Sequence, residues 1–245
     1  MVKLKELAEN KPREGQDKFY ARIRSEGLQW NYKRVRRVYL LLGLNQRKRI
    51  KRRVPTRVKE ALYQPSQANK IWSMDFMSDA LLSKRRFRTL NIMDDFNRKA
   101  VSIEADFSFP ATSVIVALQR AIHENGKPEK IRTDNGPEFI SSALSDWCKA
   151  QNITLQHVQP GKPMQNGYIE RLNRTFRQDV LDAYLFEDIM EVRTIAEEWM
   201  EDYNHKRPHE ALGGVPPVKY AENFSSRGLA PLMKTNNNLS LNNPI

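Results

Sequence analysis

Residues 70–105 read KIWSMDFMSDALLSKRRFRTLNIMDDFNRKAVSIEA. The stretch contains three runs rich in apolar and β-branched residues, at 71–78, 87–93 and 100–105, and the polar letters DDFNRK at 94–99 separate the last two. Runs of this length that are bounded by turn-forming residues are typical of β-strands. We therefore predict that this part of the chain forms a β-meander.

The chain downstream of the meander alternates between helical and strand patterns. Val114, Leu118 and Ile122 recur at helical spacing in a segment that starts at Pro110 and ends before Gly126. A meander followed by alternating helices and strands is typical of an α/β fold with a mixed sheet. We predict helices over 110–124, 137–151 (with Pro137 at its first position), 165–181 and 188–204, and strands over 130–133 and 153–158.

Two short helices are predicted ahead of the sheet. Asp17 is a candidate N-cap of the first helix, which Gly27 ends, and Asn31 is a candidate N-cap of the second, which Gly43 ends. Two short helices joined by a tight link are typical of a helix-turn-helix unit. Largely off the apolar stripe of the second helix lie the basic residues Lys33, Arg34 and Arg37.

Positive charge is concentrated in the first quarter of the chain. The formal net charge is +12, and residues 1–60 hold 19 Lys and Arg against 6 Asp and Glu. Because unopposed cations repel one another, this segment favours a phosphate-binding role over a merely solvated surface. The arm after the second helix is broken by Pro55. Its expected phosphate-binding residues are Arg47, Lys48, Arg49, Lys51, Arg52 and Arg53.

Membrane and disulfide classes are not favoured by this sequence. The longest apolar run, Val38–Leu44, is far shorter than the about 20 residues of a membrane-spanning helix. The first residues lack the apolar segment of a secretory signal. Cys148 is the only cysteine, so neither an intrachain disulfide nor a zinc cluster of cysteines is expected. We expect a cytoplasmic, nucleoid-associated protein without a membrane partner.

Three acidic residues stand where a ligand site is expected. Asp75 lies inside an otherwise apolar strand, where an unpaired charge is unfavourable. Asp134 follows strand 130–133, and ligands bind at the carboxyl ends of strands in α/β sheets. Glu170 lies off the apolar stripe of helix 165–181. Taken singly, these acids fit an edge strand, a turn and a helix ion pair. Taken together, they suit two Mg²⁺ or Mn²⁺ ions.

The segments around these acids carry a family resemblance. WSMDF around Asp75, TDNGPEF around Asp134 and PMQNGYIERLNRTFR around Glu170 resemble the DDE core of bacterial insertion-sequence transposases, and are similar to the retroviral integrase core. The 35 residues between Asp134 and Glu170 match the Asp-35-Glu pattern of that superfamily. The resemblance covers residues 17–222. Within it, MDDFNRKAVSIE and YNHKRPHEAL are similar to the second open reading frame of the frameshifting transposase family.

This resemblance implies a division of the chain into three parts. Residues 1–62 would form a basic, helix-turn-helix-like DNA-binding module and linker. Residues 63–206 would form a ribonuclease-H-like catalytic core, an α/β fold whose mixed sheet is flanked by helices. Residues 207–245 would form a C-terminal extension that is disordered at its end.

The resemblance also implies a reaction and a role for each residue. Asp75 would bridge two Mg²⁺ or Mn²⁺ ions, Asp134 would hold one of them and Glu170 the other. The reaction would be cleavage at the 3′ end of an element and transesterification of that end into another DNA, without ATP or a covalent protein–DNA intermediate. Further DNA contacts would come from Lys162, Asn166, Arg174 and Arg177.

The resemblance also implies partners for this protein, and the sequence leaves alternative functions open. The family works as an oligomer on DNA, and the product of an upstream frame, or a fusion with it, supplies recognition of the element ends. The alternatives are a non-catalytic DNA-binding regulator or inactive partner of the transposase, and a ribonuclease H. Three further polar residues are interpreted structurally: Asp94 and Asp95 as turn residues of the meander, and His209 as part of a turn after a helix.

Overall fold

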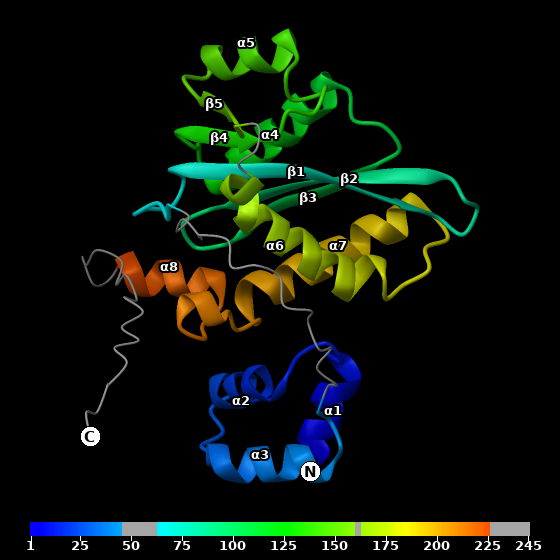
Figure 1. The fold of residues 1–245 in the computed structure, drawn as a ribbon, viewed down its shortest axis with the longest axis vertical. Coiled ribbons are helices and arrows are strands. Elements are labelled where there is room, and N and C mark those ends of the chain that lie inside the picture. The colour runs from blue at the N-terminus through cyan, green and yellow to red at the C-terminus, as the bar shows by residue number, and fades with distance from the viewer. Residues whose placement is uncertain (46–62, 160–162, 226–245) are drawn as a thin grey trace, which may run out of the picture.

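A five-stranded mixed sheet forms the centre of the computed structural model, which describes residues 1–45, 63–159 and 163–225 (Figure 1). Its strands are β1 (Ile71–Ala80), β2 (Arg86–Asp94), β3 (Ala100–Asp106), β4 (Lys130–Thr133) and β5 (Thr154–His157). They lie in the order β3-β2-β1-β4-β5. The β1–β2 and β2–β3 pairs are antiparallel, whereas β4 runs parallel to both β1 and β5. The predicted meander and mixed sheet are therefore confirmed.

Helices cover both faces of this sheet. α4 (Ala111–Asn125) and α5 (Ser142–Ala150) lie on one face, and α6 (Gly167–Phe176) and α7 (Ile189–His205) lie on the other (Figure 1). This arrangement is the predicted α/β architecture.

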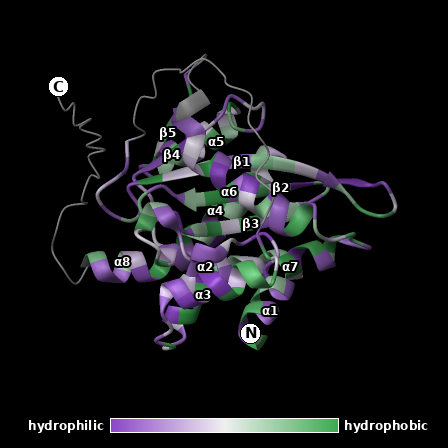
Figure 2. Ribbon diagram, turned by 60° about the horizontal axis from the view of Figure 1, so that its bottom comes forward, coloured by the Kyte–Doolittle hydropathy of each residue, from purple (hydrophilic) through white to green (hydrophobic). Residues whose placement is uncertain are grey.

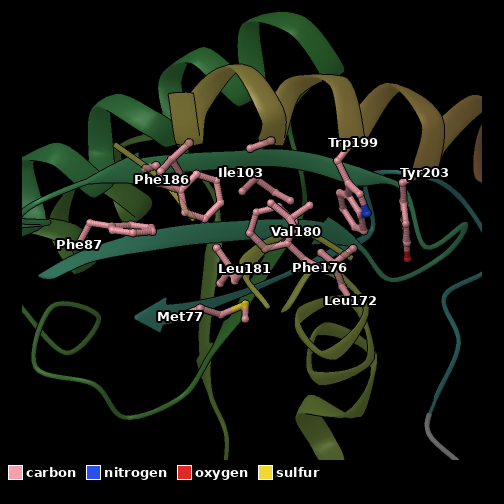
Figure 3. Close-up of a cluster of buried hydrophobic side chains, with 14 of the residues drawn as sticks. Met77, Phe87, Ile103, Leu172, Phe176, Val180, Leu181, Phe186, Trp199 and Tyr203 are labelled. Carbon is pink, nitrogen blue, oxygen red and sulfur yellow. The ribbon is translucent and has the colours of Figure 1, made fainter. Parts of the chain in front are cut away.

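Alternate residues of the strands supply two hydrophobic cores. On β1, Trp72 and Met74 are buried with α4 and α5, whereas Met77 is buried with α6 and α7. Figure 3 shows the core on the α6 and α7 face, where the rings of Phe176 and Trp199 meet edge-to-face with centroids 5.1 Å apart. This separation follows from the period of two along a strand, which sends successive side chains to opposite faces.

The predicted helix over 137–151 begins later than expected. Ser141 is the N-cap of α5, and its Oγ accepts a hydrogen bond from the backbone N–H of Leu144 at 3.4 Å. Pro137 instead lies in a turn that the backbone bond from Phe139 N–H to Gly136 carbonyl closes at 2.9 Å. The placement of Pro137 at the first helical position was therefore wrong, because the serine further along the chain supplies the cap.

The predicted helix over 165–181 consists of three kinds of turn. A 3-10 turn over Pro163–Asn166 leads into α6, and a π-helical turn over Arg177–Leu181 follows it. The apolar stripe predicted for this helix is confirmed, since Ile169, Leu172 and Phe176 are fully buried. The spacing of apolar residues in a sequence does not distinguish α-helical turns from 3-10 or π-helical turns at the ends of a helix.

Three helices, one more than predicted, form a small bundle at the N-terminus. They are α1 (Val2–Asn10), α2 (Gln16–Ser25) and α3 (Tyr32–Leu41). Figure 2 shows hydrophilic and hydrophobic residues together on α3, as an amphipathic helix requires. The core of this bundle contains Leu4 and Leu7 of α1, so the missed helix completes the packing of α2 and α3.

One of the two predicted N-caps in this bundle is confirmed. Asn31 caps α3, and its Oδ1 accepts from Lys33 N–H at 2.8 Å. The N-cap of α2 is Gly15, so the assignment of Asp17 was wrong. Asp17 lies inside the first turn of α2, where its carboxylate accepts the hydroxyl of Tyr32 at 2.8 Å.

Buried ion pairs join the N-terminal bundle to the core. The Arg22 guanidinium contacts Glu14 at 2.7 Å and Asp202 of α7 at 3.0 Å. Arg207, after the end of α7, contacts Asp179 at 2.5 Å and Glu14 at 3.5 Å. The bundle therefore lies against α7 and the π-helical turn, on the side of the core away from β4 and β5 (Figure 1).

A short helix, α8 (Pro217–Ser225), was not predicted. It packs on the turn between β2 and β3, where the ring of Phe96 lies 5.6 Å from Tyr220 and 5.0 Å from Phe224. The predicted disordered end, within 226–245, and the predicted linker, within 46–62, both lie outside the described residues. No helix within the described part of the chain has the length and apolarity to cross a membrane.

Candidate active site

Three carboxylates line one open pocket of about 310 Å³. Asp75 comes from β1, Asp134 follows β4, and Glu170 lies in the first turn of α6. Asn135, Val158, Gln159 and Asn166 complete the lining. The three acids singled out in the sequence are therefore brought together, although up to 95 positions separate them in the chain.

The sheet register accounts for the first two acids. β1 and β4 are parallel neighbours with Ser73 opposite Arg132, so Asp75 and Asp134 each follow a paired residue by two positions. The third acid depends on α6, which packs on β1 and β2 through Ile169. Because Ile169 points into the core, Glu170 beside it is exposed.

Asp75 is held in place by two hydrogen bonds. Its Oδ1 accepts from Phe76 N–H and its Oδ2 accepts from Asn173 Nδ2, both at 2.8 Å. Asn91, opposite Asp75 on β2, donates to Asn173 Oδ1 at 2.7 Å and so orients that amide. The sequence alone does not reveal that Asn173 orients Asp75, because an asparagine three residues after a glutamate on a helix is common and has no distinctive pattern.

Burial, together with the nearby carboxylates of Asp134 and Glu170, raises the pKa of Asp75 from 3.8 to about 6. The bonds from Phe76 and Asn173 oppose this rise. A half-buried carboxylate next to two others is a site of uncompensated negative charge, which a bound cation would relieve.

Gly136 explains the turn after Asp134. Its N–H donates to Asp134 Oδ1 at 3.0 Å, and a Cβ built on Gly136 would lie 3.1 Å from the same oxygen. A side chain at this position would therefore press on the carboxylate. The Asn135-Gly136 pair keeps the turn tight enough for Asp134 to remain at the rim of the pocket.

The donor atoms of the pocket fit a hard divalent cation. The carboxylates of three residues and the amides of Asn135, Gln159 and Asn166 offer oxygen ligands, which Mg²⁺ and Mn²⁺ prefer. As they stand, no three His, Cys, Asp or Glu side chains within residues 1–45, 63–159 and 163–225 are close enough together to hold a metal ion. Asp134 and Glu170 are exposed, and Asp134 keeps its second carboxylate oxygen outside the bond from Gly136.

The predicted DNA-binding residues fall into separate groups. Asn166 lines the pocket, and Arg174 is exposed one turn of α6 beyond Glu170. Arg177 lies 3.3 Å from Asp79 and donates to the Ser78 carbonyl at 2.9 Å, so it is partly engaged within the protein. Lys33, Arg34 and Arg37 are exposed on α3 in the N-terminal bundle. Outside the described residues lie Arg47, Lys48, Arg49, Lys51, Arg52, Arg53 and Lys162.

The two acids of the meander turn differ from each other. Asp94 is a turn residue as interpreted, since it accepts from the backbone N–H groups of Asn69 and Phe96. Asp95 is fully buried and pairs with Arg132 at 2.8 Å, so its interpretation as turn chemistry was incomplete. Burial raises its pKa to about 6, against the effect of the Ser73 hydroxyl and Arg132.

The structural interpretation of His209 is confirmed. Its ring packs edge-to-face on Tyr203 with centroids 4.6 Å apart, and its backbone pairs with Val215. Burial lowers its pKa to about 3, and the positive charge of Arg207 adds to this effect. His209 therefore belongs to the framework behind α7 and not to the carboxylate pocket.

Comparisons with known proteins agree with this architecture. Two family models, both described as integrase core domain, match residues 65–163 and 151–217. The 31.7 kDa protein of insertion element IS407 from Burkholderia multivorans is 39% identical over 230 residues, covering 94% of this chain and 83% of that protein. The 39.2 kDa protein of insertion element IS476 from Xanthomonas euvesicatoria is 36% identical over 226 residues, covering 92% of this chain and 65% of that protein.

A solved structure shares the fold. A chain of the simian T-cell lymphotropic virus intasome matches with a TM-score of 0.56 at 17% sequence identity, covering 95% of this chain and 78% of that one. At this identity the likeness concerns the fold alone. Together with the family models it identifies the core as the ribonuclease-H-like fold of integrases.

Proposed function

The chain belongs to the family of insertion-element transposases with an integrase core domain, and we propose that it catalyses metal-dependent cleavage of DNA 3′ ends and their transfer to another DNA. Membership of this family implies a role in DNA transposition. The observation that carries the catalytic proposal is the gathering of Asp75, Asp134 and Glu170 around one open pocket.

In this proposal the pocket residues divide the work by their surroundings. Asp75, fixed by Asn173 and the Phe76 amide, would be the rigid ligand of the Mg²⁺ or Mn²⁺ ions. Asp134 and Glu170, which are exposed, would complete the set of carboxylate ligands. Bound ions would activate the attacking oxygen and stabilise the leaving one. The pKa of Asp75, which burial and then the neighbouring carboxylates raise, supports this assignment.

DNA is proposed to reach the pocket along cationic and amide groups. Asn166 at the pocket and Arg174 on the next turn of α6 would contact the end that is cut. Arg177 joins them if DNA displaces Asp79. The exposed cations of α3 and the basic arm that follows would bind phosphates further away, and assembly as an oligomer, with the upstream-frame product for end recognition, would bring two DNA ends together.

The test is a cleavage and joining assay on labelled DNA that carries the ends of the element. The chain alone and its fusion to the upstream-frame product are each incubated with Mg²⁺ or with EDTA. Glu170→Gln keeps the size of the side chain and removes its charge, so we expect joining to disappear. Glu197→Gln, an exposed glutamate on α7, is the matched control and should join DNA at the wild-type rate.

Two outcomes would contradict the proposal. Joining that persists in EDTA or in Glu170→Gln would exclude the metal-binding role of the carboxylates. Salt-sensitive DNA binding without joining, by the chain and the fusion alike, would favour the alternative of a non-catalytic DNA-binding regulator or inactive partner. Joining by the fusion alone would support the proposal and assign end recognition to the upstream frame.

A further inference from the structure

A buried ion pair lies behind the carboxylate pocket. Arg132 Nη1 donates to Asp95 Oδ2 at 2.8 Å, and the exposed fractions of the two side chains are 10% and 0%. Asp95 Oδ1 also accepts the hydroxyl of Ser73 at 2.7 Å. The same Arg132 nitrogen donates to the backbone carbonyl of Gln165 at 3.1 Å. Neither charged side chain lines the pocket itself.

The contacts of this pair reach β1, which carries Asp75, β4, which Asp134 follows, and the 3-10 turn that leads into α6. Arg132 itself and the two residues that the pair contacts, Ser73 and Gln165, each precede one of the three acids by two to five positions in the chain. The pairs are Ser73 with Asp75 on β1, Arg132 with Asp134 at the end of β4, and Gln165 with Glu170 at the start of α6. The carboxylate of Asp95 and the guanidinium of Arg132 therefore connect three segments that are distant in the chain: β1, β4 and the 3-10 turn before α6.

The turn that carries Asp95 makes a second contact with α6. The Arg98 guanidinium lies over the ring of Tyr168 at 3.3 Å from its centroid, and Tyr168 stands two positions before Glu170. Arg98 is buried with Asp95 in the β2–β3 turn. The chain is thus held just before α6, where Arg132 bonds to Gln165, and again in the first turn of α6, where Arg98 contacts Tyr168.

Stability alone does not account for such a pair. A buried ion pair often contributes no more to folding than apolar residues of similar volume, because both charges lose their hydration. An apolar pair, however, would make no directional bonds to Ser73 or to the Gln165 carbonyl. Those bonds fix the orientation of the elements that bear the acids.

We propose that Asp95 and Arg132 are positioning residues that set the spacing of Asp75, Asp134 and Glu170 for the binding of divalent cations. The inference rests on the proposed function and adds to it two residues outside the pocket. Partners behind a ligand sphere often change metal affinity or activity by about 10–100-fold when they are removed.

The experiment compares Asp95→Asn and Arg132→Met with the wild-type chain in the active form, alone or fused. Glu14→Gln is the matched control, because it breaks another buried carboxylate–guanidinium pair, Glu14 with Arg22, in the N-terminal bundle. Two quantities are measured: the joining rate at saturating DNA, and the Mg²⁺ concentration that gives half of the thermal stabilisation by Mg²⁺. The second needs no catalysis.

We expect both core variants to join DNA about 10–100-fold more slowly and to need correspondingly more Mg²⁺, with the DNA concentration for half-maximal rate unchanged. Glu14→Gln should keep the wild-type joining rate at saturating DNA and the wild-type Mg²⁺ requirement. Arg132→Lys keeps a charge beside Asp95 but has a shorter, single-nitrogen head. It should therefore fold even if Arg132→Met does not, and it should still lose joining because it cannot also reach Gln165.

Normal joining and normal Mg²⁺ affinity in folded Asp95→Asn or Arg132→Lys would overturn the inference. Equal losses in Glu14→Gln would overturn it as well, since they would reduce the effect to general destabilisation. If the wild-type chain and fusion join no DNA, the proposed function fails. The Mg²⁺ titration then still decides whether the pair positions the acids.

Discussion

At the scale of single residues, the candidate site depends on buried side chains that fix the orientation of Asp75 through hydrogen bonds. Asp75 is oriented by Asn173, which is itself oriented by Asn91. The three acids could be singled out from the sequence because Asp75 interrupts an apolar strand, Asp134 follows a strand end, Glu170 lies off an apolar stripe, and the segments around all three carry family motifs. Asn91 and Asn173 could not, because buried amides have no periodic signature and gain their meaning only from the partner across the fold.

Gly136→Ala tests the close approach at Asp134. The added methyl group would lie 3.1 Å from Asp134 Oδ1 and would push that carboxylate away from its place at the pocket. We expect DNA joining to fall at least about tenfold, as for other disturbed metal ligands, with little change in thermal stability. The rates and melting temperatures of both proteins are measured side by side.

Gly15→Ala is the matched control for that substitution. A Cβ on Gly15 meets nothing within 4 Å, and Gly15 lies in the N-terminal bundle. A joining rate for Gly136→Ala equal to that of Gly15→Ala would show that the turn tolerates a side chain and that Asp134 does not depend on it.

At the scale of elements, local chemistry predicted most helices and strands but not all their ends. Strand β4 matched its predicted bounds, and α3 begins where Asn31 can cap it. The predicted start of α5 was wrong because Pro137 and Ser141 are both acceptable near a helix start, and it is the Ser141 hydroxyl that caps the helix. The α1 helix was missed, since nine polar-rich residues form a helix here only because Leu4 and Leu7 pack on α2 and α3.

Asn31→Ala tests the contribution of the cap to the N-terminal bundle. Its side chain satisfies the Lys33 N–H, and loss of a comparable cap destabilises a protein by about 0.5–2 kcal/mol. We expect a decrease of this size in the free energy of unfolding, measured by chemical denaturation. Asn31→Asp retains a capping oxygen and should unfold like the wild type. An equal decrease in both variants would attribute the effect to another contact of Asn31.

At the scale of the whole molecule, charged residues join parts that are distant in sequence. Arg22 and Asp202, 180 positions apart, link the N-terminal bundle to α7. His209 is packed near this junction, where Arg207 and Lys18 lower its pKa in addition to burial. The bundle therefore shares with the core an interface of paired charges, which differs from the apolar packing inside each part.

The low pKa of His209 predicts an effect of pH on stability. With a folded pKa of about 3, His209 stays neutral while an unfolded chain takes up a proton below about pH 6.5. Its contribution to stability is thus complete above pH 6.5 and is lost as the pH falls toward 3, by about 1.4 kcal/mol per pH unit. Asp75 and Asp95 act in the opposite direction, because their folded pKa values are raised.

A pair of variants isolates the histidine from those acids. The difference in free energy of unfolding between the wild type and His209→Gln is measured from pH 7.5 to 4.5, in a range chosen around the ordinary histidine pKa. We expect the advantage of the wild type to shrink as the pH falls. His123→Gln, at an exposed site on α4, is measured alongside as a substitution of a histidine outside this junction. Parallel pH curves for the wild type and His209→Gln would refute the assignment.

Local patterns in the sequence were enough to predict the meander, the alternation that follows it and two of the N-terminal helices, because period, capping and turn chemistry act over a few residues. The folded structure was needed to show that the three acids line one pocket, that Asp95 and Arg132 lie buried behind it, and that the N-terminal bundle rests on α7. Asp95 and Arg132 are 37 positions apart. Their pairing depends on the sheet order and on burial, and neither property leaves a local pattern in the chain.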